Sequence, residues 1–241
     1  MAINVETLKT RALTALIFVA VMLVGLLWNQ RSFIVLFTII HFGCWYEFVK
    51  LMKKIYGEQY LKYCLLGLVY ITMPILMIIN LGFKGGVFSN DRINEITNTT
   101  QYSPLLPIAI IFSIWINDTM AYLVGSIIGK TPFSKISPKK TWEGTGGGTI
   151  LCVLVVGFLF PLLADKYFYP FVQKQTWFII AAICAIFGTI GDLLESKLKR
   201  MANVKDSGSI MPGHGGFLDR FDSLLVAVPF VWLYVKLFIT Q

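Results

Sequence analysis

The segment from Ser196 to Asp222 (SKLKRMANVKDSGSIMPGHGGFLDRFD) carries the chain's densest group of residues that could do chemistry. Several of its basic side chains can receive an anion such as a phosphate ester: Lys197, Lys199, Arg200 and Lys205. Asp219 and Asp222 are three residues apart, so on a helix they share a face and could share a divalent cation. The glycines around His214 leave backbone amides that a phosphate can approach: Gly213, Gly215 and Gly216. The segment therefore indicates a site for a polyanion and a metal.

The rest of the chain is largely apolar. It has 241 residues, of which 56% are hydrophobic and 14% charged, whereas a soluble domain carries about 25% charged residues. Seven apolar segments are long enough, or nearly so, to cross about 30 Å of hydrocarbon. They are residues 12–28, 33–49, 63–83, 105–129, 149–164, 176–194 and 217–238. The pattern predicts an all-α polytopic membrane protein with about seven transmembrane helices, or eight, and cytoplasmic catalytic loops.

Two regions are expected along the chain. They are N-terminal transmembrane helices in residues 1–104, and a catalytic transmembrane region in residues 105–241 with cytoplasmic loops 130–148 and 195–216. The first apolar segment follows Lys9 and Arg11, as in a signal peptide. No small-residue cleavage site precedes Trp28, so we expect a retained span. The cysteines stand singly in apolar segments, and we interpret them as buried small hydrophobic residues: Cys44, Cys64, Cys152 and Cys184.

The lysines and arginines set the orientation. With the N-terminus inside, 15 of the 21 lie on inner segments. This is the positive-inside bias of membrane proteins, and it places the C-terminus outside. The net charge of +8 gathers in these loops, so we expect a membrane and no nucleic acid as partner. The basic loops, together with the segment from Ser196 to Asp222, are predicted to face the cytoplasm.

Asp118 interrupts the fourth apolar segment about 18 Å from Lys130 if the helix is unbroken. An ionised carboxylate at that depth is costly, so we expect a partner, a cavity or a protonated side chain. A hydrogen-bonded aspartic acid that pairs two helices is the alternative.

The inner loop of residues 129–148 (GKTPFSKISPKKTWEGTGGG) combines four lysines with a glycine run ahead of the next helix. A glycine-rich turn beside lysines at a helix N-terminus can bind a phosphate chain, although the loop has no P-loop motif. Taken alone, Lys139 and Lys140 could instead be cations that fix the topology near anionic lipid.

Asp192 and Glu195 lie three residues apart at the cytoplasmic end of the sixth segment, on one helical face. A solvated helix-end cluster is one interpretation, in which Asp219 and Asp222 form only a polar first turn favoured by the helix dipole. Acids at the ends of several helices favour convergence on one metal instead. Mg²⁺ prefers one or two carboxylates plus phosphate oxygens and water. With the lysines, this suits phosphoryl or nucleotidyl transfer by positioning and charge neutralisation.

The spacing within this segment resembles the signature of the phosphatidate cytidylyltransferases (CDP-diacylglycerol synthases). The matching positions are Ser196, Lys199-Arg200, Lys205-Asp206, Gly208, Pro212, His214-Gly215-Gly216 and Asp219-Arg220-Phe221-Asp222, with Met211 as a conservative departure. Further stretches resemble family segments: Asp118 with Ala121-Tyr122, Ser137 to Gly144, and Gly191-Asp192. The resemblance covers the C-terminal half in detail and the first hundred residues only as hydrophobic spans.

The resemblance implies a Mg²⁺-dependent reaction of CTP with phosphatidate that gives CDP-diacylglycerol and pyrophosphate, in phospholipid biosynthesis at the cytoplasmic face of the bacterial inner (plasma) membrane. It implies catalytic roles for Asp192, Lys199, Arg200, Lys205, Asp219 and Asp222, with Asp192, Asp219 and Asp222 as metal ligands. It implies substrate contacts for Asp118, Ser137, Lys139, Lys140, Lys197, Asp206, His214, Gly215, Gly216 and Arg220. His214 could donate to a phosphate or shape a turn; no general base is needed, because a phosphate monoester is already an anionic nucleophile. A homodimer is left open.

Two other functions fit parts of the sequence. A CTP-dependent polyprenol or phytol kinase would share the nucleotide and the membrane but would transfer the γ-phosphoryl group and release CDP. A secondary transporter would use Asp118 as a proton or ion site, with inverted repeats and paired broken helices. The sequence has no internal repeat and concentrates its charge at one membrane face. The nucleotidyltransferase is therefore the leading interpretation.

Overall fold

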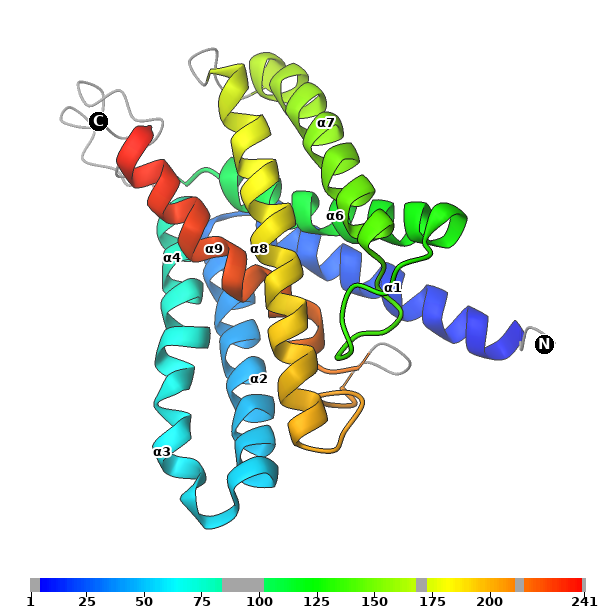
Figure 1. The fold of residues 1–241 in the computed structure, drawn as a ribbon. Helices are drawn as coiled ribbons and strands as arrows, with labels where there is room; N and C mark the ends of the chain where they lie inside the picture. Colours follow the sequence, from blue (N-terminus) through cyan, green and yellow to red (C-terminus); the bar gives the residue numbers. More distant parts are fainter. Residues whose placement is uncertain (1–4, 84–101, 168–172, 211–214, 240–241) are drawn as a thin grey trace.

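The computed structural model describes residues 5–83, 102–167, 173–210 and 215–239. Within these ranges the chain is helical apart from connecting loops and two isolated bridges, Phe83–Tyr102 and Pro132–Thr141. Figure 1 shows a bundle in which α2, α3, α4 and α8 run alongside one another, while α1 and α6 pass behind α8. The fold class expected from the sequence, an all-α protein, is confirmed for the described residues.

The first two helices are joined by a tight turn. α1 (Val5–Leu27) leads into α2 (Gln30–Tyr56) through Asn29. Asn29 Oδ1 accepts a hydrogen bond from Ser32 N at 2.9 Å, and Ser32 Oγ accepts one from Asn29 N at 3.1 Å. This capping box satisfies two otherwise free amides, so the chain changes direction within a few residues.

A second arm returns along α2 (Figure 1). It consists of η1 (Gly57–Gln59), α3 (Tyr60–Cys64), a π-helical turn η2 (Leu68–Thr72) and α4 (Met73–Gly82). Thr72 of η2 links this arm to α2: its Oγ1 accepts a hydrogen bond from Trp45 Nε1 at 2.9 Å and lies 3.0 Å from His41 Nε2. The hairpin therefore has a polar tie within its apolar contact surface.

Four further helices complete the described chain: α6 (Leu105–Ile128), α7 (Trp142–Tyr167), α8 (Lys174–Met201) and α9 (Leu218–Phe238). Helices α6 and α7 approach closely because small residues face each other, as is common between membrane helices. A Cβ on Gly144 would lie 2.8 Å from the Cα of Gly125. Helices α8 and α9 meet in the same way at Gly191, where a Cβ would lie 2.5 Å from the backbone oxygen of Asp222. These contacts fix the helix ends that carry the polar residues.

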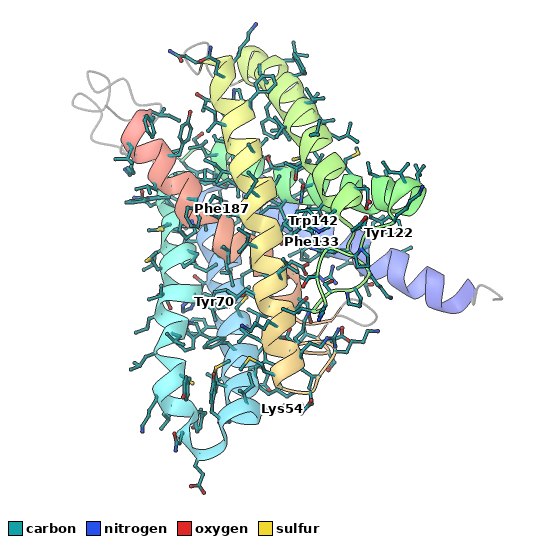
Figure 2. All side chains as sticks on the ribbon, in the orientation of Figure 1. Lys54, Tyr70, Tyr122, Phe133, Trp142 and Phe187 are labelled. Atoms are coloured by element: carbon teal, nitrogen blue, oxygen red, sulfur yellow. The ribbon has the colours of Figure 1, made fainter. Side chains whose placement is uncertain are left out.

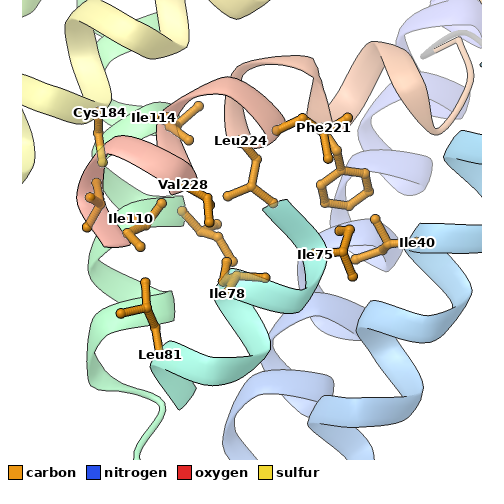
Figure 3. Packing of buried hydrophobic residues seen from close by; sticks show 14 of the residues in the cluster. Ile40, Ile75, Ile78, Leu81, Ile110, Ile114, Cys184, Phe221, Leu224 and Val228 are labelled. Carbon is orange, nitrogen blue, oxygen red and sulfur yellow. The ribbon is translucent and has the colours of Figure 1, made fainter. Parts of the chain in front are cut away.

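The core lies where α4, α6, α8 and α9 meet. Figure 3 shows Ile78 of α4, Ile110 of α6 and Val228 of α9 packed together, and all three are fully buried. Of the cysteines, Cys44, Cys152 and Cys184 are all buried in the hydrophobic core, and Cys64 is half-buried. Their interpretation as buried small hydrophobic residues is confirmed for three of the four.

Among the residues that the structure describes, five helical stretches are long and apolar enough to cross a membrane. They are Gln30–Cys64, Leu105–Ile128, Trp142–Leu162, Lys174–Met201 and Leu218–Phe238. Two shorter apolar helices, Ala12–Leu27 and Leu68–Gly82, correspond to the remaining predicted segments. The class of a multi-pass membrane protein is supported, and the larger number of spans stays a prediction.

Candidate active site

Asp219, in the first turn of α9, has four donor groups within hydrogen-bonding distance, one of which, the Ser207 hydroxyl, it shares with Glu47. Its Oδ1 accepts from Lys199 Nζ at 2.6 Å. Its Oδ2 accepts from Gly216 N (2.8 Å), Ser207 N (2.9 Å) and Ser207 Oγ (2.9 Å). The helix dipole favours a negative charge at this position. Asp219 thus joins the end of α8 to the start of α9.

Lys199 lies between two acidic side chains. It pairs with Asp219 and also with Glu195, one turn earlier on α8. The Glu195 side chain is fully buried, and the Lys199 side chain is 12% exposed. Asp192 does not join this group, since its partner is Lys140 on the loop before α7. Asp192 and Glu195, which were expected on one helical face, therefore pair with two different lysines.

Asp192 forms an ion pair with Lys140, which arrives on the loop between α6 and α7. The pair borders an open polar pocket of about 430 Å³ that is lined by residues of α6, α7, α8 and that loop. The sequence predicted several of the lining residues: Asp118, Ser137, Lys139, Lys140 and Asp192. Asn117, which is 3% exposed, also lines the pocket. Its Oδ1 has no hydrogen-bond partner within the described chain. Asp118 thus borders a pocket, which is one of the three environments expected for it.

The loop that carries the two pocket lysines is held by Glu143, at the start of α7. The Glu143 carboxylate accepts from Lys130 N (3.2 Å), Thr131 N (3.1 Å) and Thr131 Oγ1 (2.7 Å). Figure 2 shows Phe133 and Trp142 at the base of the loop, where their rings meet edge to face. The loop is thus closed at both ends, which places Lys140 against α8.

Asp222 is nearly buried, and its Oδ1 accepts from Ser223 N at 2.6 Å. Asp192, Glu195 and Asp118 lie close enough to act on it electrostatically. Acidic side chains therefore gather where α6, α8 and α9 meet. A buried group of this kind needs cations, which makes the region suited to a bound positive ion.

Glycines of the segment contact carboxylates. Gly215 has φ +81°, a backbone conformation that side chains rarely adopt, and a Cβ there would lie 2.6 Å from Asp219 Oδ2. The Gly216 amide, expected to meet a phosphate, donates to Asp219. The structure therefore assigns these two positions a role in shaping the loop around Asp219, and phosphate contact remains a prediction for them.

The remaining predicted residues lie outside the lining of the pocket. Four are exposed on the end of α8 or in the loop that follows it: Lys197, Arg200, Lys205 and Asp206. Arg220 is exposed on α9, and its positive charge interacts electrostatically with Asp118. His214 falls outside the described residues. Contacts of these residues with substrate are still predictions.

Glu47, on α2, is a site residue that the sequence reasoning missed. It is 1% exposed and accepts from Ser207 Oγ (2.6 Å), Phe217 N (2.9 Å) and Leu218 N (2.9 Å). The available signal was a single acid inside a long apolar segment, which is costly unless it is paired. The same argument had identified Asp118.

The residues fit a divalent cation in part. The described chain contains no group of three or more His, Cys, Asp or Glu side chains arranged to hold a metal. Asp219 already has four donors on its two oxygens. Mg²⁺ on a nucleotide needs only one or two carboxylates, however, since phosphates and water supply the rest. Asp192, which lines the polar pocket, fits that requirement.

Comparison with known proteins identifies the family. The family model described as "Cytidylyltransferase family" matches residues 59–238. The chain belongs to this family. It is 43% identical over 145 residues to a phosphatidate cytidylyltransferase of Bacillus subtilis (strain 168), an alignment that covers 60% of this chain and 52% of that relative. It is 33% identical over 228 residues to a phosphatidate cytidylyltransferase of Rickettsia typhi, covering 93% of this chain and 90% of the relative.

A third relative extends the similarity along the whole chain. A phosphatidate cytidylyltransferase of Rickettsia bellii is 31% identical over 241 residues, covering 97% of this chain and 93% of the relative. The chain thus spans about half the length of the Bacillus relative and nearly all of the Rickettsia relatives. The alignments with the two Rickettsia relatives cover more than nine-tenths of this chain, so they also include helical segments before residue 59, which the family model does not cover.

Proposed function

We propose that the chain is a membrane-embedded phosphatidate cytidylyltransferase, which converts CTP and phosphatidate to CDP-diacylglycerol and pyrophosphate. The observation that carries the proposal is the polar pocket of about 430 Å³, in which Lys139 and Lys140 face Asp118 and Asp192. A pocket with cations on one side and acids on the other suits a nucleoside triphosphate and its metal. The names of the relatives supply the reaction.

In this reaction a phosphate oxygen of phosphatidate bonds to the α-phosphorus of CTP, and the bond to the β-phosphate oxygen breaks, so that pyrophosphate leaves. The phosphate monoester is already an anion, so the chain need not remove a proton. Lys139 and Lys140 neutralise charge on the triphosphate, and their positions are fixed by the loop that Glu143 holds. The free Oδ1 of Asn117 accepts from a hydroxyl or amino group of the nucleoside.

Mg²⁺ is proposed as the cofactor, with Asp192 and Asp222 as the carboxylates that would hold it. When bound, it supplies charge neutralisation at the phosphates. Asp219, already bonded to Lys199 and to the amides of Ser207 and Gly216, orients Lys199 and the start of α9. This assignment departs from the sequence-based expectation in giving Asp219 a supporting position.

The enzyme is placed in the bacterial inner (plasma) membrane with the pocket toward the cytoplasm, where CTP is found. The excess of lysine and arginine on one side of the predicted spans supports this orientation. Lys54 lies at the end of α2 (Figure 2), in the cluster of basic residues between the second and third predicted spans. The proposal leaves a homodimer open, and light scattering of the purified protein measures the oligomeric state.

The test is an assay in detergent with Mg²⁺, phosphatidate and labelled CTP. Label on the α-phosphate should enter the lipid fraction, and label on the γ-phosphate should leave as pyrophosphate. Asp192→Asn should lose activity by about 100-fold or more, whereas Glu58→Gln, on an exposed turn, should keep it. Transfer of γ-label to a lipid would instead identify a CTP-dependent lipid kinase, and the absence of any labelled lipid would refute the proposal.

A further inference from the structure

Glu47 is the one acid of α2 that reaches the segment from Ser196 to Asp222 within the described structure. Its two carboxylate oxygens accept three hydrogen bonds of 2.6 to 2.9 Å, from the Ser207 hydroxyl and from the amides of Phe217 and Leu218. The donors lie 160 to 171 residues further along the chain. Glu47 therefore links the N-terminal helices to both ends of the stretch between Ser207 and Leu218.

Two of these donors are backbone amides at the start of α9. The first amides of a helix have no partner within the helix, and a carboxylate that accepts from them also benefits from the helix dipole. In most proteins a side chain just before the helix performs this function. Here the residue at that position is Phe217, which cannot accept, and Glu47 replaces it from another helix.

The third donor couples Glu47 to Asp219. The Ser207 Oγ lies 2.6 Å from Glu47 Oε2 and 2.9 Å from Asp219 Oδ2. A hydroxyl has a single hydrogen, so a change at one carboxylate alters the bond available to the other. Asp219 in turn binds Lys199. The chain of contacts thus runs from Glu47 through Ser207 and Asp219 to the buried lysine.

The fit around Glu47 leaves no free space. A Cβ on Gly208 would lie 2.1 Å from Glu47 Oε1, and a Cβ on Gly216 would lie 2.2 Å from both carboxylate oxygens. The backbone at both glycines therefore packs directly on the carboxylate. A carboxylate that only capped α9 would need contact with the amides of that helix alone. The Glu47 carboxylate also packs against the backbone of Gly208, in the loop after α8.

We propose that Glu47 is a positioning residue of the enzyme: its carboxylate holds Ser207 against the first amides of α9 and thereby sets the placement of Asp219 and Lys199. The proposal rests on the proposed function for its kinetic consequence. It goes beyond the family match, because Glu47 lies outside the residues that the family model covers.

The central test compares Glu47→Gln with the exposed control Glu58→Gln in the full-length protein. The amide keeps the size of the side chain but presents a donor where one oxygen accepted, so at least one α9 amide loses its partner. Glu47→Gln should lower kcat about 100-fold while KM for CTP changes by roughly threefold at most, the pattern for misplacement of a formed site. Glu58→Gln should match wild type. A folded Glu47→Gln protein with wild-type kcat would overturn the proposal.

A second measurement does not depend on the reaction. Hydrogen exchange should show the amides at the start of α9 exchanging at least about tenfold faster in Glu47→Gln, with the later turns of α9 unchanged. Unchanged protection there would also refute the positioning role. If wild-type protein makes no labelled lipid, the proposed function fails and the exchange result still decides the structural claim.

A third variant covers the case in which Glu47→Gln does not fold. Ser207→Ala removes only the shared hydroxyl and leaves Glu47 with both amides and Asp219 with Lys199 and two amides. It should fold and should lower kcat by less than Glu47→Gln, with KM for CTP preserved. A folded Ser207→Ala protein with wild-type kcat would contradict the coupling through the hydroxyl.

Discussion

Removing the Lys199 charge should destabilise the protein strongly. Lys199 is the cation that contacts both Glu195 and Asp219, and the side chains of these acids are 0% and 6% exposed. Lys199→Met keeps an unbranched chain of similar length but leaves two buried carboxylates without their counter-ion. Breaking a buried ion pair from one side costs about 3–5 kcal/mol. For a chain of this size, that corresponds to a fall in melting temperature of roughly 6–20 °C.

The measurement is thermal unfolding in detergent, followed by the fraction of monodisperse protein that remains after heating. Lys197→Met is the matched control, because Lys197 is exposed on the same helix, and it should change stability by less than about 0.5 kcal/mol. Adding Glu195→Gln to Lys199→Met should restore part of the loss, since one of the orphaned charges is removed. A melting temperature for Lys199→Met within about 2 °C of wild type, less than 1 kcal/mol of destabilisation, would refute the proposed triad.

Two further substitutions test other contacts. Gly191→Ala should destabilise the protein by about 1–3 kcal/mol, because its Cβ would lie 2.5 Å from the Asp222 backbone oxygen. The control Gly146→Ala, on α7, should leave stability unchanged, because nothing lies within 4 Å of its Cβ. Equal melting temperatures for the two variants would contradict this packing. Glu143→Gln should raise KM for CTP roughly tenfold, about 1.4 kcal/mol, since the loop that carries Lys140 loses acceptors; initial rates against CTP measure this, and an unchanged KM would separate the loop from nucleotide binding.

The helices could be predicted from the sequence because a helix that crosses a membrane requires a long run of apolar residues, which the sequence shows directly. Each of the seven predicted segments corresponds to an apolar helix or pair of short helices. The pocket was predicted in part for a related reason: a polar residue inside an apolar run, such as Asp118, requires a special environment. The structure adds the cavity and brings Lys140 to Asp192.

The partners of each carboxylate could not be predicted. Spacing along a helix places Asp192 and Glu195 near one face, but which lysine each one meets depends on the path of a loop and on the approach of a second helix. Glu47 shows the same limit, because its donors are brought to it only by the tertiary packing of α2 against α9. The roles of the glycines beside Asp219 likewise depend on contacts from a distant helix.

The contact between Glu47 and the two glycines has a consequence for how this chain can vary and recombine. An acid at position 47 and the absence of a side chain at positions 208 and 216 form one steric and electrostatic unit. Relatives that enlarge residue 208 or 216 should therefore carry a shorter side chain at position 47, and the three positions should co-vary. A chimera that joins the first helices of one relative to the last four of another should work only when both parents share this unit.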